Sequence, residues 1–388
     1  MRFKEKIECT KCIMDSNNDP DIILNEVGIC NHCLQFDLAY DKLPIGDNKK
    51  KELDAILNKI KEAGENKKYD CLLGISGGVD SSYLAYLCKY YNLRPLIIHF
   101  DNGWNSELAV ENIQKLLYKL GFDLETLVIN WEEFKDLQLS YFKSGVVDLE
   151  FPTDHAIIAS MFRIAKKHKI KYVISGHNIV TEGTYLPKSW VHSKLDFSNL
   201  KDIHQTYGQV KLKTYPYLSF FKMLYYKFAT KLEYIQLLNF VDYNKEDVKK
   251  KLILELEWRD YGGKHYESIF TRFYQGYILP KKFNIDKRKF HYSCLIHSGQ
   301  ITKSEALALM EEPIYDTDML AIDKDYVLKK LNFTDETFEA YMNEPIRKHN
   351  EFKTDDELWD NYFKFIEIIK KLIFRKRVNF FLIILYYF

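Results

Sequence analysis

A glycine-rich stretch that begins at Asp70, DCLLGISGGVDSSYLAYLCKYY, constrains the fold of this chain more than any other. Its first residues form an apolar run with the length of a buried strand, while Leu84, Leu87 and Cys88 then recur at helical spacing. The string SGGVDSS, residues 76–82, lies between them. We therefore predict a strand that turns sharply into a helix.

Such a turn favours binding of an anion. Glycines let the backbone pass close to a ligand, and a helix N-terminus offers unpaired amides to phosphate oxygens. The Lys-Ser/Thr ending of a Walker loop is missing, so we predict that the loop holds pyrophosphate. The string resembles the PP-loop of the ATP pyrophosphatases, which have the adenine nucleotide hydrolase-like fold. The resemblance implies that ATP is bound by Ser76, Gly77, Gly78, Val79, Asp80, Ser81 and Ser82, with Ser76 and Asp80 as catalytic residues. The alternative is a glycine-rich turn without function.

Length and charge limit the functional class. A chain of 388 residues is long enough for two or three domains. Lys and Arg number 56 against 55 Asp and Glu, a net charge of +1, which argues against a large nucleic-acid footprint. The beginning, MRFKEKIECTKC, has no apolar segment of the signal-peptide type, so we expect a cytoplasmic protein with reduced thiols.

Four cysteines near the beginning have the spacing of a zinc knuckle. Cys9 and Cys12 form one CxxC pair, and Cys30 and Cys33 form the second. Four thiolates complete a tetrahedral shell, so we predict a structural Zn²⁺ rather than a catalytic one. His32 is then not needed as a ligand and is expected to face solvent. Disulfides are the alternative.

Strand and helix patterns alternate after the cysteines. Apolar runs predict strands over 95–100, 124–130 and 172–175, and helical spacing predicts helices over 47–65, 107–120, 134–142 and 154–168. This alternation predicts an α/β fold with a doubly wound, mostly parallel sheet. The pattern fades after Lys188. We therefore divide the chain into a zinc knuckle and linker (1–46), a PP-loop ATP-binding α/β domain (47–190) and a mainly helical region for substrate or partner binding (191–388).

Polar residues follow two of the predicted strands, where open α/β sheets place their ligands. Asp101 and Asn102 are candidates to face the nucleotide, although an Asp-Asn-Gly turn has nearly equal weight. The segment from Gly176 to Gly183, GHNIVTEG, is similar to the second signature of PP-loop enzymes. Its predicted site residues are Gly176, His177, Asn178 and Glu182, with His177 and Glu182 as catalytic residues. Asp80 and Glu182 could together bind Mg²⁺ on the triphosphate.

The second half of the chain contains an aromatic segment and a polar one. Residues 216–243 are dense in aromatic and aliphatic side chains and predict a buried helix or an oligomer interface. The polar stretch WRDYGGKHYES and the following LPKKFNIDKRK predict a site for an anionic sugar nucleotide, although a solvated basic helix face has about equal weight for the latter. The candidate substrate contacts are Arg259, Lys264, His265, Glu267, Lys282 and Arg288.

The end of the chain carries two further patterns. Residues 291–309 predict two helices joined by a Ser-Gly turn, and Thr302 with Glu305 forms a capping box. The last residues are basic and then apolar, too short to span a membrane. They fit a peripheral membrane contact, or docking onto the protein's own core or a partner. Cys71, Cys88 and Cys294 are expected to be core thiols.

Several strings together resemble one family, the N-acetyl sugar amidotransferases of bacterial surface-polysaccharide and flagellin-glycan synthesis. These strings are the CxxC pairs, SGGVDSS, HFDNGW, FPTDHA, GHNIVTEG, WRDYGGKHYES, LPKKFNIDKRK and SGQITKSEAL. The resemblance implies that ATP activates an acetamido group of a nucleotide-linked sugar and that ammonia converts it to an acetamidino group. It also implies a glutaminase and an ammonia-channelling, cyclase-like partner, because the chain has no glutaminase signature of its own. The aromatic region 216–243 is a candidate docking face for that partner.

Two other functions remain open from the sequence. A tRNA thiolase also joins a zinc knuckle to a PP-loop, but it would require a reactive cysteine pair beyond the loop and a basic RNA-binding surface. A non-catalytic nucleotide-binding module is the second alternative, although the intact loop and the matching acidic turn favour turnover.

Overall fold

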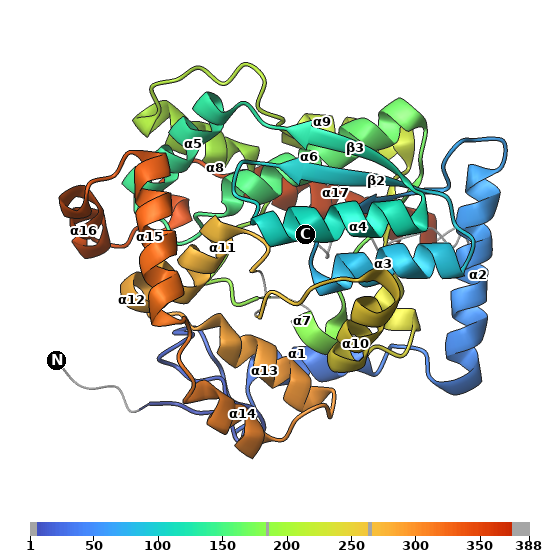
Figure 1. Ribbon diagram of the computed structural model, residues 1–388, viewed down its shortest axis with the longest axis horizontal. Coiled ribbons are helices and arrows are strands. Elements are labelled where there is room, and N and C mark those ends of the chain that lie inside the picture. The colour runs from blue at the N-terminus through green and yellow to red at the C-terminus, as the bar shows by residue number, and fades with distance from the viewer. Residues whose placement is uncertain (1–5, 184–185, 263–265, 375–388) are drawn as a thin grey trace.

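The computed structural model describes residues 6–183, 186–262 and 266–374 (Figure 1). The predicted contacts Lys264 and His265, and the tail 375–388, lie outside these residues. The helices are α1 (Asn31–Tyr40), α2 (Gly46–Gly64), α3 (Val79–Tyr90), α4 (Glu107–Leu120), α5 (Trp131–Ser144), α6 (Phe151–His168), α7 (Ile179–Glu182), α8 (Phe197–Tyr207), α9 (Phe220–Thr230), α10 (Lys245–Leu256), α11 (Ile269–Phe273), α12 (Leu279–Phe283), α13 (Lys287–His297), α14 (Lys303–Met310), α15 (Thr317–Leu331), α16 (Asp335–Asn343) and α17 (Asp356–Phe374), with the short helices η1 (Leu237–Phe240), η2 (Tyr274–Ile278) and η3 (His349–Glu351).

Five parallel strands form the sheet. They are β1 (Cys71–Gly74), β2 (Pro95–Asp101), β3 (Asp123–Val128), β4 (Tyr172–Ile174) and β5 (Glu233–Ile235), in the order β3-β2-β1-β4-β5. The chain moves outward from β1 through β2 to β3, and then returns to the other side of β1 as β4. The strand order therefore reverses between β1 and β4. In open α/β sheets, ligands bind outside the carboxyl ends of the strands at such a switch point.

The two faces of the sheet bury alternate residues in separate clusters. Leu73 and Ile97 pack with α2, α3, α4 and α10, whereas Leu72 and Ile98 pack with α6 and α9 on the opposite face. Helices on both faces explain why the central strands β1 and β2 are mostly apolar, because neither of their faces meets water, whereas the edge strand β3 is largely exposed. The predicted doubly wound, parallel α/β fold is confirmed.

Several element boundaries differ from the prediction. Helix α5 begins at Trp131 rather than Phe134, because Asn130 caps it by accepting a hydrogen bond from the Glu133 amide (3.1 Å). The stretch 216–243 is not one buried helix: α9 leaves Phe221, Tyr225 and Phe228 exposed. Strand β5 then adds an edge to the sheet, which the sequence analysis did not anticipate, since three residues are too few to give a periodic signal.

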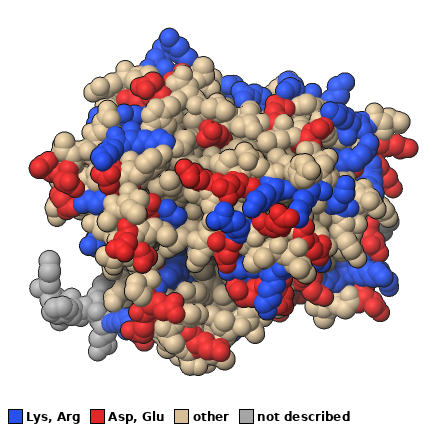
Figure 2. Space-filling model, viewed as in Figure 1, with Lys and Arg blue, Asp and Glu red and all other residues tan. Residues whose placement is uncertain are grey.

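The last third of the described chain is helical. The pair of helices predicted over 291–309 is present as α13 and α14, although α13 begins earlier, at Lys287. The capping box of Thr302 and Glu305 is confirmed at the start of α14. Cys71, Cys88 and Cys294 are buried, as expected. Among the described helices, none combines the length and the apolar character needed to cross a membrane. The face shown in Figure 2 carries cations and carboxylates interspersed over its surface.

Candidate functional site

The predicted strand-loop-helix turn is present between β1 and α3. Gly77 has φ +83°, and a Cβ there would lie 2.6 Å from the carbonyl oxygen of Ala109 on α4. Only glycine fits this conformation and this close approach. Gly78 is the N-cap residue of α3, and its amide donates to Ser76 Oγ (3.2 Å). The first amides of α3 therefore lie at the loop, where the partial positive charge of a helix N-terminus favours an anion.

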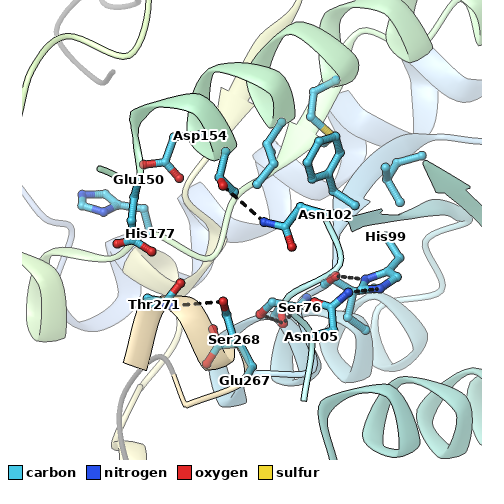
Figure 3. A pocket seen from close by; sticks show the side chains of 18 of the residues that line it. Ser76, His99, Asn102, Asn105, Glu150, Asp154, His177, Glu267, Ser268 and Thr271 are labelled. Carbon is cyan, nitrogen blue, oxygen red and sulfur yellow. Dashed lines mark hydrogen bonds between the residues drawn. The ribbon is translucent and has the colours of Figure 1, made fainter. Parts of the chain in front are cut away.

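A cavity of about 540 Å³ opens beside this loop (Figure 3). This volume is within the range of small-molecule sites. Ser76 and Ser81 line it at one end, and Ile75, Ile98 and Phe100 provide an apolar wall at the carboxyl ends of β1 and β2. The other predicted loop residues, Gly77, Gly78, Val79, Asp80 and Ser82, are not part of this lining, and Ser82 is buried within α3.

The second strand-end turn lies next to the loop. A Cβ on Gly176 would be 3.6 Å from Asp80 Cβ, so the turns after β1 and β4 are in contact. His177 and Glu182 both line the cavity, and His177 Nδ1 lies 2.9 Å from a Glu182 carboxylate oxygen. Asn178 has a different position: it is fully buried, and its side chain caps α7 by accepting from the Thr181 amide (2.9 Å). The structure therefore gives Asn178 a structural role instead of the predicted contact.

Asp80 and Glu182 both influence the pKa of one buried tyrosine, Tyr243. The Tyr243 hydroxyl donates a hydrogen bond to Asp80. Burial, followed by the negative charges of Asp80 and Glu182, raises the pKa of Tyr243. Two carboxylates close enough to influence the same phenol fit the oxygen-donor set that Mg²⁺ prefers.

The two candidate nucleotide contacts in the turn after β2, Asp101 and Asn102, have different positions. Asn102 lines the cavity, and its Nδ2 donates to Thr153 Oγ1 of α6 (3.2 Å). Asp101 instead accepts from the Gly103 amide (2.9 Å) and from Asn105 Nδ2 (3.2 Å). The alternative of an Asp-Asn-Gly turn therefore describes Asp101, while Asn102 remains a candidate ligand contact.

The polar segment after α10 lies over the phosphate loop. Trp258 Nε1 donates to the Gly77 carbonyl oxygen (2.9 Å), and the Val79 amide donates to the Tyr261 hydroxyl (3.1 Å). A Cβ on Gly78 would lie 3.3 Å from Glu267 Oε1, so Glu267 lies at the loop and lines the cavity there. Burial, followed by the charge of Glu267, raises the pKa of Tyr261.

Three predicted substrate contacts are not at the cavity. Arg259 forms an exposed ion pair with Glu111 (2.8 Å). Lys282 donates to two backbone carbonyl oxygens near α16, those of Tyr341 (2.6 Å) and Glu344 (2.7 Å). Arg288 binds the Asp286 carboxylate (2.9 Å) and the Glu312 carbonyl oxygen (2.7 Å). These cations join structural elements and are not among the residues that line the cavity.

Other residues take their place. Lys287, next to Arg288, lines the cavity together with His291 one turn further along α13. Glu150 and Asp154 line it from α6, and Ser268 and Thr271 line it from the region of α11 (Figure 3). Burial lowers the pKa of Lys287 and raises that of Asp154. The sequence offered a signal for three of them: Asp154 lies in the FPTDHA string, Ser268 ends WRDYGGKHYES, and Lys287 lies in LPKKFNIDKRK.

His99 links the loop to this lining. His99 Nδ1 lies 3.1 Å from the Ile75 carbonyl oxygen, and its Nε2 lies 3.2 Å from Asn105 Nδ2. The pattern of a buried strand gave no indication of a histidine at the site.

The four knuckle cysteines are assembled as predicted. Their sulfur atoms lie within 4.8 Å of one another, and all four residues are buried. The sulfur pairs Cys9–Cys33, Cys12–Cys30 and Cys30–Cys33 are 3.5, 3.8 and 3.3 Å apart. Zn–S bonds of about 2.3 Å in a tetrahedron require about 3.8 Å between sulfurs, so the cluster fits zinc.

The surroundings of two histidines near the cluster were not predicted. His32 does not face solvent: its Nε2 lies 2.7 Å from the Asp19 carboxylate, and its side chain is 10% exposed. His297, which the sequence analysis did not single out, lies with Nε2 3.1 Å from Cys33 Sγ.

The chain is similar in sequence to one family model and to several known proteins. Residues 267–368 match the family model described as LPS biosynthesis protein WbpG-like, C-terminal domain. An uncharacterized protein of Methanocaldococcus jannaschii is 26% identical over 318 residues, which are 79% of this chain and 94% of that protein. A tRNA-specific 2-thiouridylase of Fusobacterium nucleatum is 30% identical over 198 residues, 49% of this chain and 52% of that protein.

Among solved structures, the NH3-dependent NAD synthetase of Campylobacter jejuni matches 77% of this chain and 98% of its own, at 14% identity and a TM-score of 0.32. The parallel sheet, its switch point and the two strand-end turns define a PP-loop protein of the ATP pyrophosphatase type. Within that class, residues 267–368 resemble the C-terminal domain of the WbpG-like LPS biosynthesis proteins.

Proposed function

We propose that the protein is an ATP-dependent amidotransferase that converts an acetamido group of a nucleotide-linked sugar to an acetamidino group in bacterial surface-glycan synthesis. The observation that carries the proposal is a single cavity with two kinds of wall. The PP-loop and the strand ends form one wall, while residues of the WbpG-like domain, Glu267, Ser268 and Thr271 among them, form the other. Such a cavity can bring a nucleotide and a second substrate together.

The chemistry follows from the poor leaving ability of an amide oxygen. The amide oxygen attacks the α-phosphorus of ATP, an O–P bond forms, and the bond to pyrophosphate breaks. Ammonia then adds to the activated carbon, and AMP leaves with the former amide oxygen. Amides at the N-terminus of α3 would stabilise the charge that develops on pyrophosphate, as donors aimed at a developing anion do.

The carboxylates have a separate role in this proposal. Asp80 and Glu182 would hold Mg²⁺, which supplies positive charge against the leaving pyrophosphate. His177, held by Glu182 at 2.9 Å, is positioned to donate a hydrogen bond at the same end of the cavity. Ser76 and Ser81, whose hydroxyl oxygens are 3.4 Å apart, would contact phosphate oxygens.

The opposite end suits the sugar. Glu150 and Asp154 can accept hydrogen bonds from sugar hydroxyls, while Lys287 and His291 can donate to an anionic group of the carrier. The apolar wall of Ile75, Ile98 and Phe100 can cover the flat face of a nucleobase. This division supports a substrate that is partly anionic and rich in hydroxyls.

A tRNA thiolase is the competing function, because a thiouridylase is among the similar proteins. Sulfur transfer would require a reactive thiol at the adenylated carbon. Cys71, Cys88 and Cys294 are at most 3% exposed, and no cysteine contributes to the cavity lining in the described part of the chain. This arrangement favours ammonia over a protein-bound sulfur as the nucleophile.

Ammonia would come from a glutaminase and a channelling partner. The exposed side chains Phe221, Tyr225 and Phe228 recur on one side of α9 and form an apolar row on the outside of the sheet layer. An exposed apolar row of this kind is typical of a protein interface. It supports region 216–243 as the docking face.

The proposal is tested by incubating the protein with Mg-ATP, ammonium and a panel of nucleotide-linked acetamido sugars. We expect AMP, pyrophosphate and a sugar product in which NH has replaced oxygen, detected by mass spectrometry. A parallel reaction contains tRNA and a sulfur donor. Thiolated tRNA, with every sugar unchanged, would assign the protein to the thiolases, and nucleotide binding without AMP formation under any condition would leave only a binding module.

A further inference from the structure

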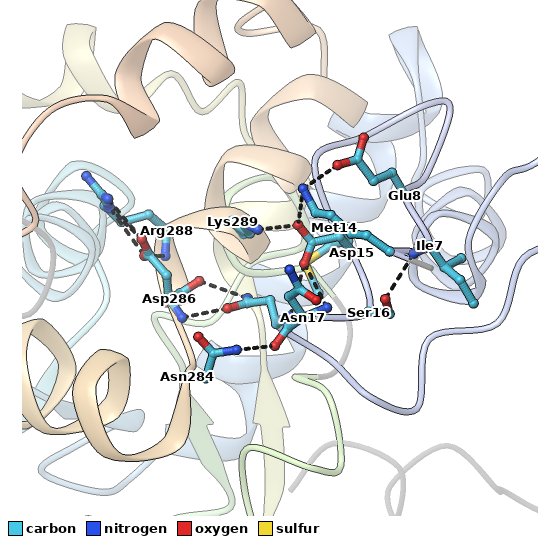
Figure 4. A network of polar contacts seen from close by, with 12 residues as sticks. Ile7, Glu8, Met14, Asp15, Ser16, Asn17, Asn284, Asp286, Arg288 and Lys289 are labelled. Atoms are coloured by element: carbon cyan, nitrogen blue, oxygen red, sulfur yellow. Dashed lines mark hydrogen bonds and ion pairs between the residues drawn. The ribbon is translucent and has the colours of Figure 1, made fainter. Parts of the chain in front are cut away.

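Helix α13 lies between the zinc knuckle and the cavity. Lys287 and His291 project from it into the cavity. Lys289, from the same helix, forms an ion pair with Asp15 of the knuckle (Figure 4), and His297 at its other end contacts Cys33. One helix therefore carries both a wall of the cavity and the contact surface of the cysteine cluster.

The entrance to α13 is also fixed by the knuckle. The Asp286 amide donates to Asn18 Oδ1 (2.7 Å), and Asn18 Nδ2 donates back to the Asp286 carbonyl oxygen (3.1 Å). Asn284 Nδ2 donates to the Asn17 carbonyl oxygen (2.8 Å), as Figure 4 shows. Since Lys287 follows Asp286 directly, these bonds set the point from which its side chain enters the cavity.

His297 connects the helix directly to the metal ligands. Its side chain is only 3% exposed, and its ring stacks on Phe36 of α1 with 4.8 Å between centroids. Nε2 lies 3.1 Å from Cys33 Sγ, the geometry of an N–H donor to a thiolate. Lys303, just beyond α13, donates to the Cys9 carbonyl oxygen (2.8 Å).

Among the described residues, the phosphate loop 76–82 has no comparable hydrogen bond or ion pair with the knuckle. Its apolar neighbours, Val79 and Leu84 of α3, belong to the cluster formed with α2, α4 and α10. The four cysteines belong to a different cluster, which contains Phe290 and Cys294 of α13. The phosphate loop and α13 are therefore supported by separate parts of the core. Helix α7, which carries Glu182, instead packs with α13: Ile179 belongs to the cysteine cluster, and Ser298 Oγ donates to the Val180 carbonyl oxygen (3.4 Å).

We propose that the metal-loaded knuckle is the support that fixes α13, so that zinc sets the position of the cavity wall carrying Lys287 and His291 while leaving the phosphate loop unaffected. His297 and Lys289 are the positioning residues. A small cysteine-rich unit obtains much of its folding free energy from the metal, and loss of the metal releases the residues that depend on it. The inference does not require the proposed reaction to be correct.

The test compares the full-length protein loaded with zinc, stripped by a chelator, and reloaded. Hydrogen exchange read by mass spectrometry should show faster exchange in α13 after stripping and unchanged exchange in α3. Labelling of lysines with an amine-reactive acetyl donor should increase at Lys287. Lys282, held by the two carbonyl oxygens near α16, is the internal control and should keep its reactivity.

Two results would overturn the proposal. One is unchanged exchange in α13 after complete loss of zinc, and the other is equal loosening of α13 and α3, which would indicate general unfolding instead of a local effect.

Substitutions separate the contact from the metal itself. Removal of a group that hydrogen-bonds a metal ligand typically weakens metal binding about tenfold or more, so His297→Ala should release zinc to a colorimetric chelator about tenfold faster. His297→Gln keeps a side-chain N–H donor and should restore much of the loss. His204→Ala is the matched control, because His204 is a half-buried histidine that pairs with Asp136 and not with a cysteine. This variant should retain zinc as the wild type does. Equal release from the Ala and Gln variants and the wild type would show that His297 does not support the cluster.

Discussion

The hydroxyl of Tyr261 accepts a hydrogen bond from the amide of Val79 at 3.1 Å, across 182 positions of sequence. That amide is the first of α3, where the phosphate loop meets the helix N-terminus. A phosphate oxygen bound at the same amide would have to displace the phenol. The segment between α10 and α11 therefore competes with the anion for which the loop is shaped.

This competition predicts that Tyr261→Phe binds nucleotide more tightly. The lost hydrogen bond is worth about 1 kcal/mol, which corresponds to about a fivefold gain in affinity. Isothermal titration with a non-hydrolysable ATP analogue measures it. Tyr266→Phe is the control, because that hydroxyl donates to the Ile314 carbonyl oxygen instead. Weaker binding of the Tyr261 variant would mean that the phenol contacts the nucleotide.

A second prediction concerns the free energy of unfolding after substitution of Gly77. Gly77→Ala places a Cβ at positive φ and 2.6 Å from the Ala109 carbonyl oxygen, so α4 must move. Gly121→Ala has the same kind of backbone conformation, φ +70°, but open space around the Cβ. We expect about 1 kcal/mol of destabilisation for Gly121→Ala from backbone strain, and clearly more for Gly77→Ala, measured by urea unfolding. Equal losses would show that the approach to α4 is not tight.

Buried His155 predicts a loss of stability in acid. Its Nδ1 lies 2.7 Å from the Lys194 carbonyl oxygen, and its Nε2 accepts from the Leu218 amide (3.0 Å), so the ring is held neutral. Burial lowers the pKa of His155 from 6.5 to about 4. Between pH 6.5 and about 4, the unfolded chain therefore binds a proton at His155 that the folded chain does not bind. The stabilisation that comes from the neutral His155 ring is fully present above pH 6.5.

As the pH falls from 6.5 to about 4, the free energy of unfolding should decrease by about 3 kcal/mol through this residue. Urea unfolding at a series of pH values measures the slope. His155→Gln, which cannot take up the proton, should have a flatter profile over the same interval. An unchanged slope in that variant would assign the acid sensitivity to other groups, such as His349, whose pKa is lowered in the same direction.

The sequence predicted the sheet and the loop well because their signals are local. The apolar runs of β1 and β2 predict burial from neighbouring residues alone. The glycine at position 77 likewise predicts a positive φ without information about distant residues. The knuckle could be predicted for the same reason, because each CxxC pair is a local pattern that can supply two thiolates to one metal ion. Strand β5 was missed because three residues at a sheet edge have no period of their own.

The cavity wall opposite the loop was predicted less well. Arg288 and Lys287 are adjacent cations in one basic string, and no sequence rule shows which of them faces the cavity. The structure decides it: Arg288 is bound by Asp286 and the Glu312 carbonyl oxygen, and Lys287 points to the other side of the helix. Tyr261 and His297 were missed because each acts on a residue far away in sequence.

The proposed reaction also predicts the effect of one substitution at the loop. Asp80→Asn removes a negative charge while keeping the shape of the side chain, and formation of AMP should fall about a hundredfold or more. Asp101→Asn is the matched control, because the Asp101 carboxylate accepts hydrogen bonds within the turn after β2, whereas Asp80 accepts from Tyr243 next to the second strand-end turn. Release of AMP from labelled ATP measures both. Equal effects of the two substitutions would argue against a special role for Asp80.

The most direct test follows the amide oxygen. An acetamido sugar labelled with ¹⁸O in its acetyl group is incubated with the protein, Mg-ATP and ammonium, and the products are separated and weighed by mass spectrometry. Adenylation of the amide oxygen predicts that the label appears in AMP and is absent from pyrophosphate and from the sugar product. Label retained in the sugar, or transferred to inorganic phosphate together with formation of ADP, would contradict the account.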